Sequence, residues 1–581
     1  PPVSQRVNLP ISKRVTVNTN DERYMNLIGR IAAVPLYDYE IPILADAKVS
    51  IEKGTGVVMC ATFGDSTDAE WFAEHNLPYR RVIMPNGKIA EEVPFIGGMK
   101  TYIARKEIIE ILREKGLLLK SEKLAHAVAT HERCGKEIEI IPSRQWYIDI
   151  LSDKDRFLRA ADKINWYPAQ MKNRYITWVE NLKWDWCISR QRYFGVPFPV
   201  WYCKDCGSPV FASKEQLPVN PLETEYIGIC SCGGNEFVPE SAVFDTWATS
   251  SITPQINERL GIKLIPMSMR THAHEIIRTW TFYSIVRSLY RTGDIPWKDL
   301  MISGFVLAKK GEKLSKSKGN SDLDPATLIS THSADALRYW SANARLGTDT
   351  FFDVEELTSK RFITKLWNAS KFSISHLEDI KLSRKPHLLP IDRWIIERTN
   401  ETFNKASELL NEYEIGQARH EIDDLFWKDF CDYYIEIVKS RLYELEIHGY
   451  EERRSAQYAL YYSLLGILKM YAIYVPHITD YIYGEFFRKH EKVVSIHLLQ
   501  WQIISDIDKS ILLFGEELKN AIFSMRKYKS ENNLSMRSEM DTLIVEHSPQ
   551  FSDWFRQSEK DLKSCAKAKK VSFTQAGSPK N

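Results

Sequence analysis

Residues 301–320 read MISGFVLAKKGEKLSKSKGN, and this stretch directs the interpretation of the rest of the chain. The apolar run MISGFVLA predicts a buried strand, and the glycine-bounded segment after it predicts a loop. In that loop lysines and serines are interleaved: Lys313, Ser315, Lys316, Ser317 and Lys318. Ammonium and hydroxyl groups in this arrangement can surround a polyphosphate and neutralise charge on its oxygens. A solvated basic surface loop would have the same composition, so the pattern alone leaves both interpretations open.

Composition limits the class of protein. The chain has 581 residues, which corresponds to about four domains at roughly 150 residues each. A hydrophobic fraction of 44% excludes general disorder, and 78 basic against 76 acidic residues exclude a polycation. The longest apolar stretch, 460–475, includes Lys469 and is too short for a membrane span, and residues 1–15 contain no apolar signal segment. We therefore expect a cytoplasmic protein without a membrane partner.

The pattern of residues changes along the chain. Residues 21–140 alternate β-like runs with Gly and Pro breaks, with one helix expected from Ala104 to Lys115. Residues 141–345 mix strands and helices as α/β folds do, and from about residue 350 apolar residues recur at helical spacing. These patterns predict a β-rich module, an α/β module and a helical bundle. The last 80 residues are less regular, and residues 555–581 are basic.

Four of the nine cysteines form two pairs in a Gly-rich insert at 200–238. The pairs are Cys203-x-x-Cys206 and Cys230-x-Cys232, each followed by glycine. Four thiolates at this spacing suit a tetrahedral, structural zinc ion in a ribbon. Because the second pair has one intervening residue instead of two, a ribbon without metal is the alternative.

A set of segments in fixed order identifies a resemblance to a known family. KLSKS, preceded by a strand that ends in GFV, resembles the KMSKS loop of class I aminoacyl-tRNA synthetases, with Leu314 in place of Met. Eight further segments agree: GTGVVMCATFGDSTDAEW, THERCG, WCISRQRYFGVPFPVW, FDTWATSS, HEIIRTWTFY, KLWNASKF, DLFWKDFCDYYIE and VPHITDYIY. Together, over about residues 20 to 540, they resemble the valyl-tRNA synthetases in their archaeal-type form, with the isoleucyl-type enzymes as the nearest relatives.

The resemblance implies a multidomain fold that combines α/β, β and α parts. The expected parts are a partial β-rich editing domain (1–140), the C-terminal half of a Rossmann-like class I catalytic domain (141–345) with a zinc-ribbon insert (200–238), connector helices (346–385), a helical anticodon-binding domain (386–501), and a C-terminal extension with a basic tail (502–581). Two basic segments, 524–531 and 566–570, are candidates for contact with the tRNA backbone, and a solvated surface is the alternative for both.

The resemblance also implies the chemistry: valine and ATP with Mg²⁺ give valyl-adenylate, and the valyl group passes to tRNA(Val). It assigns Lys316 and Lys313 to catalysis and ATP binding, and Ser315, Ser317 and Gly304 to ATP binding. Lysines there would stabilise charge during attack on the α-phosphate. The valine pocket would be formed by Trp247, Glu275 and Ile276, although an isolated Trp247 would be an ordinary core residue.

Editing is the second implied activity. A small apolar pocket discriminates valine from threonine only about 10²-fold; the valyl enzyme is itself the published example of this limit. By resemblance, Asp68 would anchor the amino group of a misplaced threonine and Asp65 would recognise its hydroxyl. An isolated GDSTD would be a surface turn. Met59 and Ala61 stand where bacterial relatives often have polar residues.

One expected motif is absent from the sequence. Class I sites use His-x-Gly-His to bind ATP phosphates, and no such string occurs here; His272-Ala-His274 lies in the second half of the fold and is not assigned that role. We therefore expect an N-terminally truncated fragment that is inactive alone, and a monomer. The alternatives are a non-catalytic tRNA-binding paralogue, an isoleucyl-type synthetase and, less favoured, a free-standing editing hydrolase.

Overall fold

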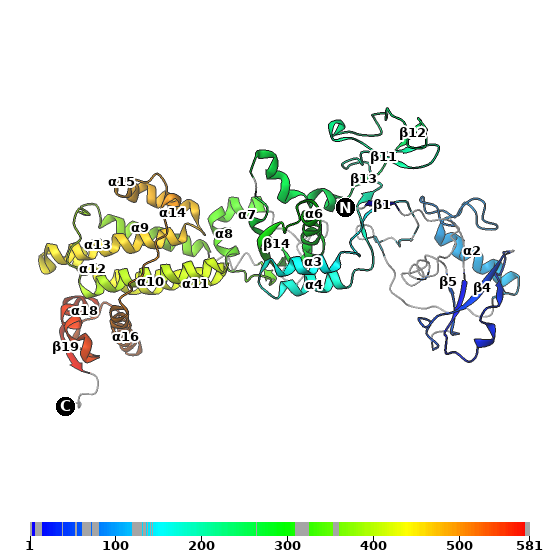
Figure 1. The fold of residues 1–581 in the computed structure, drawn as a ribbon. Coiled ribbons are helices and arrows are strands. Elements are labelled where there is room, and N and C mark those ends of the chain that lie inside the picture. Colours follow the sequence, from blue (N-terminus) through cyan, green and yellow to red (C-terminus); the bar gives the residue numbers. More distant parts are fainter. Residues whose placement is uncertain are drawn as a thin grey trace. The chain divides into compact units, whose positions relative to one another are not determined.

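A computed structural model describes residues 3–5, 14–37, 39–52, 55–60, 71, 81–118, 130–131, 135, 137–139, 141, 143–262, 264–307, 325–352 and 359–575. The chain forms two compact units (Figure 1). The first takes residues 1–153 and 182–249, and the second takes residues 154–181 and 250–581. Neither unit is one continuous segment, because residues 154–181 belong to the second.

The first unit contains a four-stranded sheet in the order β3-β4-β2-β5. The strands are β3 (Ile31–Ala33), β4 (Glu40–Ala45), β2 (Arg14–Val17) and β5 (Val57–Cys60). Strand β2 runs parallel to β4 and antiparallel to β5. Ile41 and Ile43 are buried while Glu40 is exposed, which is the alternation expected of a half-buried strand. The expected helix is present as α2 (Thr101–Glu114).

Three small sheets complete the first unit. They are β1 (Val3–Gln5), β6 (Trp146–Ile148) and β8 (Trp186–Cys187); β11 (Pro209–Phe211), β10 (Val200–Cys203) and β12 (Phe237–Pro239); and the pair β9 (Ser189–Arg190) with β13 (Val243–Phe244). Buried Trp146 stacks on Phe198 with ring centroids 5.8 Å apart. Packing of this kind joins the cysteine-rich ribbon to the β6 sheet.

The second unit begins with a parallel sheet in the order β14-β15-β7. Its strands are β14 (Met267–Ala273), β15 (Trp297–Ser303) and β7 (Asn165–Tyr167), and the helices beside them are α3 (Lys154–Asp162), α4 (Met171–Glu180) and α6 (Phe282–Thr292). Helix α6 connects β14 to β15, so these elements form a βαβ unit. Trp297, Leu300 and Ile302 of the central strand are completely buried, as parallel strands covered by helices require.

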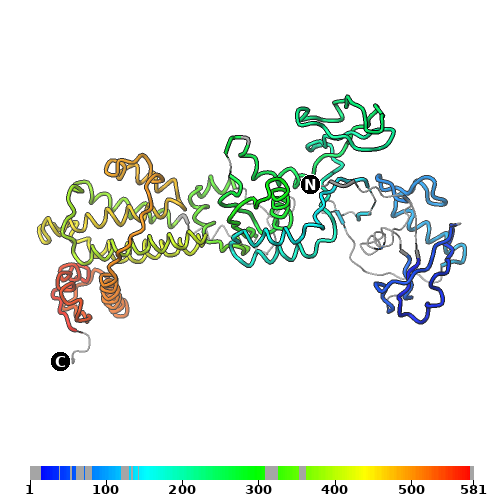
Figure 2. The backbone as a smooth tube through the Cα atoms, viewed as in Figure 1, coloured from blue at the N-terminus to red at the C-terminus, as the bar shows by residue number. Residues whose placement is uncertain are grey.

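A helical bundle follows, as the spacing of apolar residues predicted. Its helices are α9 (Ser359–Ser375), α10 (Pro390–Asn411), α11 (Ile415–Asp423), a helix over Asp424–Tyr434, α12 (Ile435–Tyr443), α13 (Leu445–Tyr471), α14 (Pro476–Ile482) and α15 (Arg488–Glu491). Figure 2 shows α10 and α13 as the yellow-green and yellow coils that lie side by side. Trp394 of α10 and Leu460 and Leu464 of α13 are completely buried in one hydrophobic core.

The bundle touches the parallel sheet through Tyr413, between α10 and α11. The Tyr413 hydroxyl donates to a carboxylate oxygen of Asp299 in β15 at 2.9 Å, and its ring lies edge-on to Tyr167 at 4.7 Å. Asn165 donates to the other oxygen of Asp299 at 2.8 Å. One carboxylate therefore joins strands β15 and β7 to the bundle.

The C-terminal residues are more regular than their sequence suggests. They form α16 (Lys509–Glu531), β18 (Met540–His547), α17 (Ser552–Gln557), α18 (Glu559–Ala566) and β19 (Ala568–Gln575), and the two strands are parallel. Leu543, Phe555 and Val571 pack into the same hydrophobic core as the bundle. The expected irregular extension is thus a βαβ element fused to that core. No helix among the described residues has both the length and the apolar character to cross a membrane.

Candidate functional site

The three parallel strands of the second unit end at a common edge. Ala273, the last residue of β14, lies opposite Ser303, the last residue of β15, and Tyr167 of β7 lies opposite Met301. Ligands of open α/β sheets bind outside the carboxyl ends of the strands. Residues that follow these ends, such as His274 and Gly304, therefore lie where such a ligand would approach.

His274 is held by two charged side chains at this edge. Arg174 Nη1 lies 3.2 Å from Nδ1, and Asp349 Oδ1 lies 2.8 Å from Nε2. Because a guanidinium only donates, Nδ1 is the acceptor and Nε2 carries the proton that faces Asp349. The backbone amide of Phe305 also donates to Asp349 at 2.8 Å. That amide, followed by the bond to His274, holds the pKa of Asp349 below its usual value.

His272, two residues earlier, is fixed in a different way. Its Nδ1 lies 2.8 Å from the carbonyl oxygen of Ala273, and its Nε2 lies 2.6 Å from the hydroxyl of the fully buried Thr281. The carbonyl only accepts, so Nδ1 donates and the Thr281 hydroxyl donates to Nε2. Burial lowers the pKa of His272, so the neutral ring is favoured.

Gly304 lies where two backbones meet. A Cβ at this position would overlap the carbonyl group of Thr348 and approach the Asp349 nitrogen at 2.6 Å. The same region pairs β16 (Val306–Leu307) with β17 (Thr350–Phe351) in parallel. Glycine is thus needed for packing just before the lysine-serine loop begins. The predicted phosphate residues Lys313, Ser315, Lys316 and Ser317 lie outside the described residues.

The three predicted valine-pocket residues fall in both units. Glu275 and Ile276 form a short helix with His274 directly after β14, with Glu275 exposed and Ile276 half-buried. Trp247 lies half-buried on α5 (Thr246–Ser250), at the end of the first unit. Their assignment to one pocket stays a prediction.

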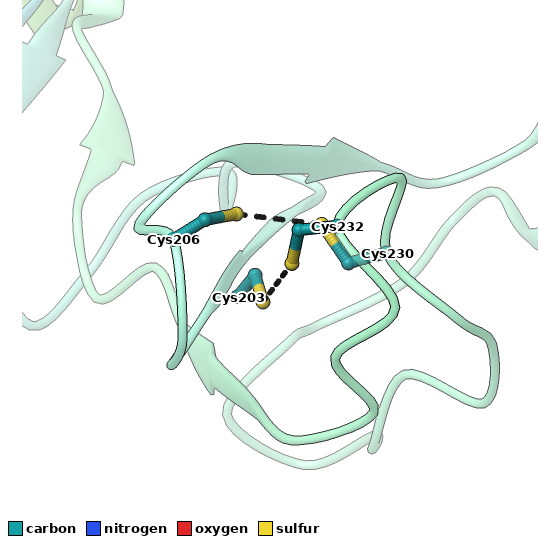
Figure 3. Close-up of side chains that lie close together, drawn as sticks. All are labelled: Cys203, Cys206, Cys230 and Cys232. Atoms are coloured by element: carbon teal, nitrogen blue, oxygen red, sulfur yellow. Dashed lines mark hydrogen bonds between the residues drawn. The ribbon is translucent and has the colours of Figure 1, made fainter.

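The four cysteines come together, as their spacing predicted (Figure 3). Cys203 and Cys232 are 3.6 Å apart at sulfur, Cys206 and Cys230 are also 3.6 Å apart, and all four sulfur atoms lie within 4.8 Å of one another. With Zn–S bonds of about 2.3 Å, a tetrahedral ion would separate its sulfurs by about 3.8 Å. The donor set therefore fits a closed four-thiolate zinc site.

Tight turns present these thiols. Gly207 and Gly233 have φ of +70° and +93°, and the Gly233 amide donates to the Cys230 carbonyl oxygen at 2.8 Å. A Cβ on Gly234 would lie 2.8 Å from the Cys203 sulfur. Hydrogen bonds from Ser208 lower the pKa of Cys206. At Cys232 the Gly234 amide lowers the pKa, but hydrogen bonds with the other cysteines outweigh it and raise the pKa, so the cluster favours one thiolate over the other.

The editing residues stay a prediction, and one of the two basic segments can be compared with the structure. Asp65, Asp68 and Ala61 lie outside the described residues, whereas Met59 lies half-exposed on β5. Within the basic segment 524–531, Lys529 is completely buried and donates to the carbonyl oxygens of Met536, Ser538 and Ala566 at 2.8–3.1 Å. Lys529 is therefore a structural residue, and contact of the segment 524–531 with tRNA stays a prediction for its other basic residues.

Sequence reasoning missed three residues of the strand edge: Arg174, Thr281 and Asp349. Asp349 is 75 residues from His274 and Arg174 is 100 residues from it, so no spacing rule connects them. The available signal was the His-Ala-His string, which the structure places at the end of β14. Polar residues at that position indicate a site even when their partners are unknown.

Two family models match the chain. One, described as "tRNA synthetases class I (I, L, M and V)", matches residues 98–353, and the other, "Anticodon-binding domain of tRNA ligase", matches residues 392–545. The first range contains the parallel sheet and the cysteine cluster, and the second contains most of the bundle. Fold and sequence together define a class I tRNA synthetase.

Individual relatives narrow the family. Valine–tRNA ligase of Rickettsia felis is 38% identical over 98% of this chain and 68% of its own length, and that of Rickettsia rickettsii is 40% identical over 92% and 68%. Valine–tRNA ligase of a Wolbachia from Brugia malayi is 36% identical over 97% and 72%. The chain belongs to the valine–tRNA ligase family. These relatives are bacterial, and the archaeal-type form stays a prediction.

Proposed function

We propose that the chain contributes to valine–tRNA ligase activity, which joins valine to tRNA(Val) with ATP as the energy source, and that the chain alone does not activate valine. The observation that carries the proposal is the 38–40% identity to valine–tRNA ligases over nearly the whole chain. The parallel strand edge supports it, because β15 and Gly304 lead into the lysine-serine loop. The bundle matched by the anticodon-binding model supports tRNA as the second substrate.

In activation, Lys316 and Lys313 would neutralise the ATP phosphates while the valine carboxylate attacks the α-phosphate and pyrophosphate leaves with Mg²⁺. Gly304 would let the loop begin close to the strand edge, since a side chain there would collide with Thr348. Asp349 and Arg174 would keep His274 in one orientation and one tautomer beside that edge. Trp247, Glu275 and Ile276 would form the valine pocket.

Two further functions belong to the proposal. The first is editing, in which mischarged threonyl-tRNA(Val) is hydrolysed. Asp68 would bind the amino group of the threonine as a carboxylate binds an ammonium ion, and Asp65 would recognise its hydroxyl. The four cysteines would hold a zinc ion, which closes the ribbon and takes no part in catalysis. We propose that the chain functions as a monomer.

The preference of the chain for one tRNA over another tests the proposed substrate. Binding of the chain to tRNA(Val) and tRNA(Ile) is compared by filter retention at one salt concentration, because affinity for tRNA depends strongly on salt. We expect at least tenfold tighter binding to tRNA(Val). Tighter binding to tRNA(Ile) would favour an isoleucyl-type enzyme, and equal binding would favour a non-specific tRNA-binding protein.

Catalysis is tested separately by valine-dependent ATP–pyrophosphate exchange. The sequence contains no His-x-Gly-His, so we expect the chain alone to give no exchange. Strong exchange would show that the strand edge described above suffices for activation. Where a catalytically competent form is available, Lys316→Ala should abolish adenylate formation and leave valine binding intact.

A further inference from the structure

A groove in the C-terminal part of the second unit has no role in the proposed function. It lies between α16 and β18 and has a volume of about 940 Å³. Figure 1 shows α16 beside the part of the chain that carries α18 and β19. One wall is a single face of α16, formed at helical spacing by Glu517, Asn520, Ala521, Ser524, Met525 and Tyr528.

The other wall is the edge of β18. Side chains alternate along a strand, so one face of a strand contributes every second residue to a wall. Here every residue from Glu539 to Ser548 lines the groove, which indicates that the strand presents its hydrogen-bonding edge. Its opposite edge is paired with β19, and among the described residues no other strand pairs with it. About half of the amides and carbonyls of β18 thus face the groove without a strand partner.

The groove is acidic. Glu517, Glu539, Asp541 and Glu546 line it, and its described lining includes no lysine or arginine. Glu517 accepts hydrogen bonds from Ser548, and Asp541 pairs with Lys569 at 2.8 Å. Within the described part of the chain, neither Glu539 nor Glu546 forms an ion pair. Carboxylates repel phosphate groups, so this surface disfavours tRNA even though it lies next to the bundle.

Apolar side chains lie among these carboxylates. Ile544 is 66% exposed at the centre of β18, and Tyr528 and Leu534 are also exposed in the lining. An open strand edge with an exposed β-branched residue is a template for pairing with another strand. With acidic residues near both ends of β18, the edge selects a strand that carries positive charge.

We propose that this groove binds an extended, basic segment of another protein, which adds to β18 as a third strand. Backbone hydrogen bonds to the β18 edge would supply affinity, as in other cases of strand addition. Lysine or arginine near Glu539 and Glu546 would supply specificity, and apolar residues would cover Ile544. The eight residues of β18 match a segment of about 26 Å in extended form. The proposal is independent of valine, ATP and tRNA.

Synthetic peptides and the full chain test it. A fluorescein-labelled octapeptide of alternating Lys and Val serves as the probe, and binding is followed by fluorescence anisotropy. The comparison peptides are alternating Glu and Val, and the Lys-Val peptide with every second amide N-methylated. We expect the Lys-Val peptide to bind at least tenfold more tightly than either, because one lacks the charge and the other lacks the backbone donors. Hydrogen exchange of residues 540–547 should slow when it binds.

Charge reversal on the protein gives the matched control. Glu539→Lys with Glu546→Lys should weaken binding of the Lys-Val peptide at least tenfold. Asp553→Lys, an equal change of charge at an 83% exposed residue of α17, should leave binding unchanged. Equal binding of all three peptides, or no effect of the double variant, would overturn the proposal. So would displacement of the peptide by tRNA, or by self-association of the chain through β18.

Discussion

The carboxylate of Asp335 accepts a hydrogen bond of 2.8 Å from the backbone amide of Ile478. Asp335 lies on α8 (Ala334–Ser341), and Ile478 lies in the first turn of α14, whose free amides an acidic side chain stabilises. One turn further along α8, Arg338 donates to the carbonyl oxygens of Ile473 and Tyr474. Helix α8 thus binds both the residues that follow α13 and the first turn of α14.

Replacing the carboxylate of Asp335 should destabilise the connection between α13 and α14. Asp335 is 5% exposed, so Asp335→Ala leaves amides of α14 without their acceptor and should cost about 1–2 kcal/mol in free energy of unfolding. Urea unfolding measures the loss, and Asp541→Ala, at an 88% exposed carboxylate, serves as the control. A loss no larger than that of the control would contradict the capping role.

A buried ion pair makes a stronger prediction. Arg441 Nη1 lies 2.5 Å from Asp392, and its Nε lies 2.9 Å from Asp561, with both residues of the first pair completely buried. Arg441→Met removes the cation and leaves two buried carboxylates, which should cost about 3–5 kcal/mol. Arg556→Met, which breaks an exposed pair with Asp553, should cost less than about 1 kcal/mol in the same unfolding experiment. Similar losses in the two variants would show that burial does not determine the effect.

The cysteine cluster predicts the metal content of the purified chain. We expect about one zinc ion per chain by elemental analysis, because four sulfurs lie at tetrahedral separations. Cys203→Ser should remove the ion and lower the unfolding temperature of the ribbon. Cys565→Ser, at a half-buried cysteine outside the cluster, should keep the ion. Unchanged zinc in Cys203→Ser would refute the assignment of the site.

Gly304 predicts the effect of one added methyl group. Gly304→Ala should cost about 1–3 kcal/mol, because the new carbon overlaps the backbone of Thr348 and cannot be relieved by a side-chain rotation. Ser303→Ala, at the exposed preceding residue, should change stability by less than about 0.5 kcal/mol. Thermal unfolding of both variants measures the two losses. Equal losses would show that the backbone at residue 304 moves away from Thr348 at little cost.

His272 predicts an acid-sensitive contribution to stability. Burial holds its pKa in the folded state below the unfolded value of about 6.5, so the unfolded chain binds the proton more tightly. Stability should therefore fall as the pH drops below about 6.5. His272→Gln, which does not titrate, should reduce this slope between pH 7 and pH 5, as measured by urea unfolding at each pH. An unchanged slope would place the sensitivity at other groups.

Much of the architecture was predictable because local patterns determine it. The helix expected at 104–115 is α2, and the cysteine pairs meet as expected. The apolar periodicity of WIIERTNETFNKASELLNEYEIG, however, continues through a break between α10 and α11 at Tyr413, whose φ is +60°. Apolar periodicity shows which residues face the core. It does not show where one helix ends when the apolar spacing continues into the next helix.

The missed residues share a physical cause. Lys529 lies in a basic segment that looks solvated, yet the carbonyl groups that surround it come from 536, 538 and 566. Asp349 is hydrogen-bonded to His274, which lies 75 residues away in the sequence. Hydrogen bonds between distant segments depend on how the chain folds back, so a local pattern identifies the side chain and leaves its partner open.

The Tyr413 contact has a mechanical consequence. The central strand β15 precedes β16 and the segment with Lys316 in the sequence, and Asp299 in β15 accepts a hydrogen bond from a tyrosine of the bundle. The bundle thus has a direct hydrogen bond to the central strand of the sheet. Tyr413→Phe would keep the ring and remove that bond. It would therefore weaken the link between the bundle and β15 while both parts keep their own fold.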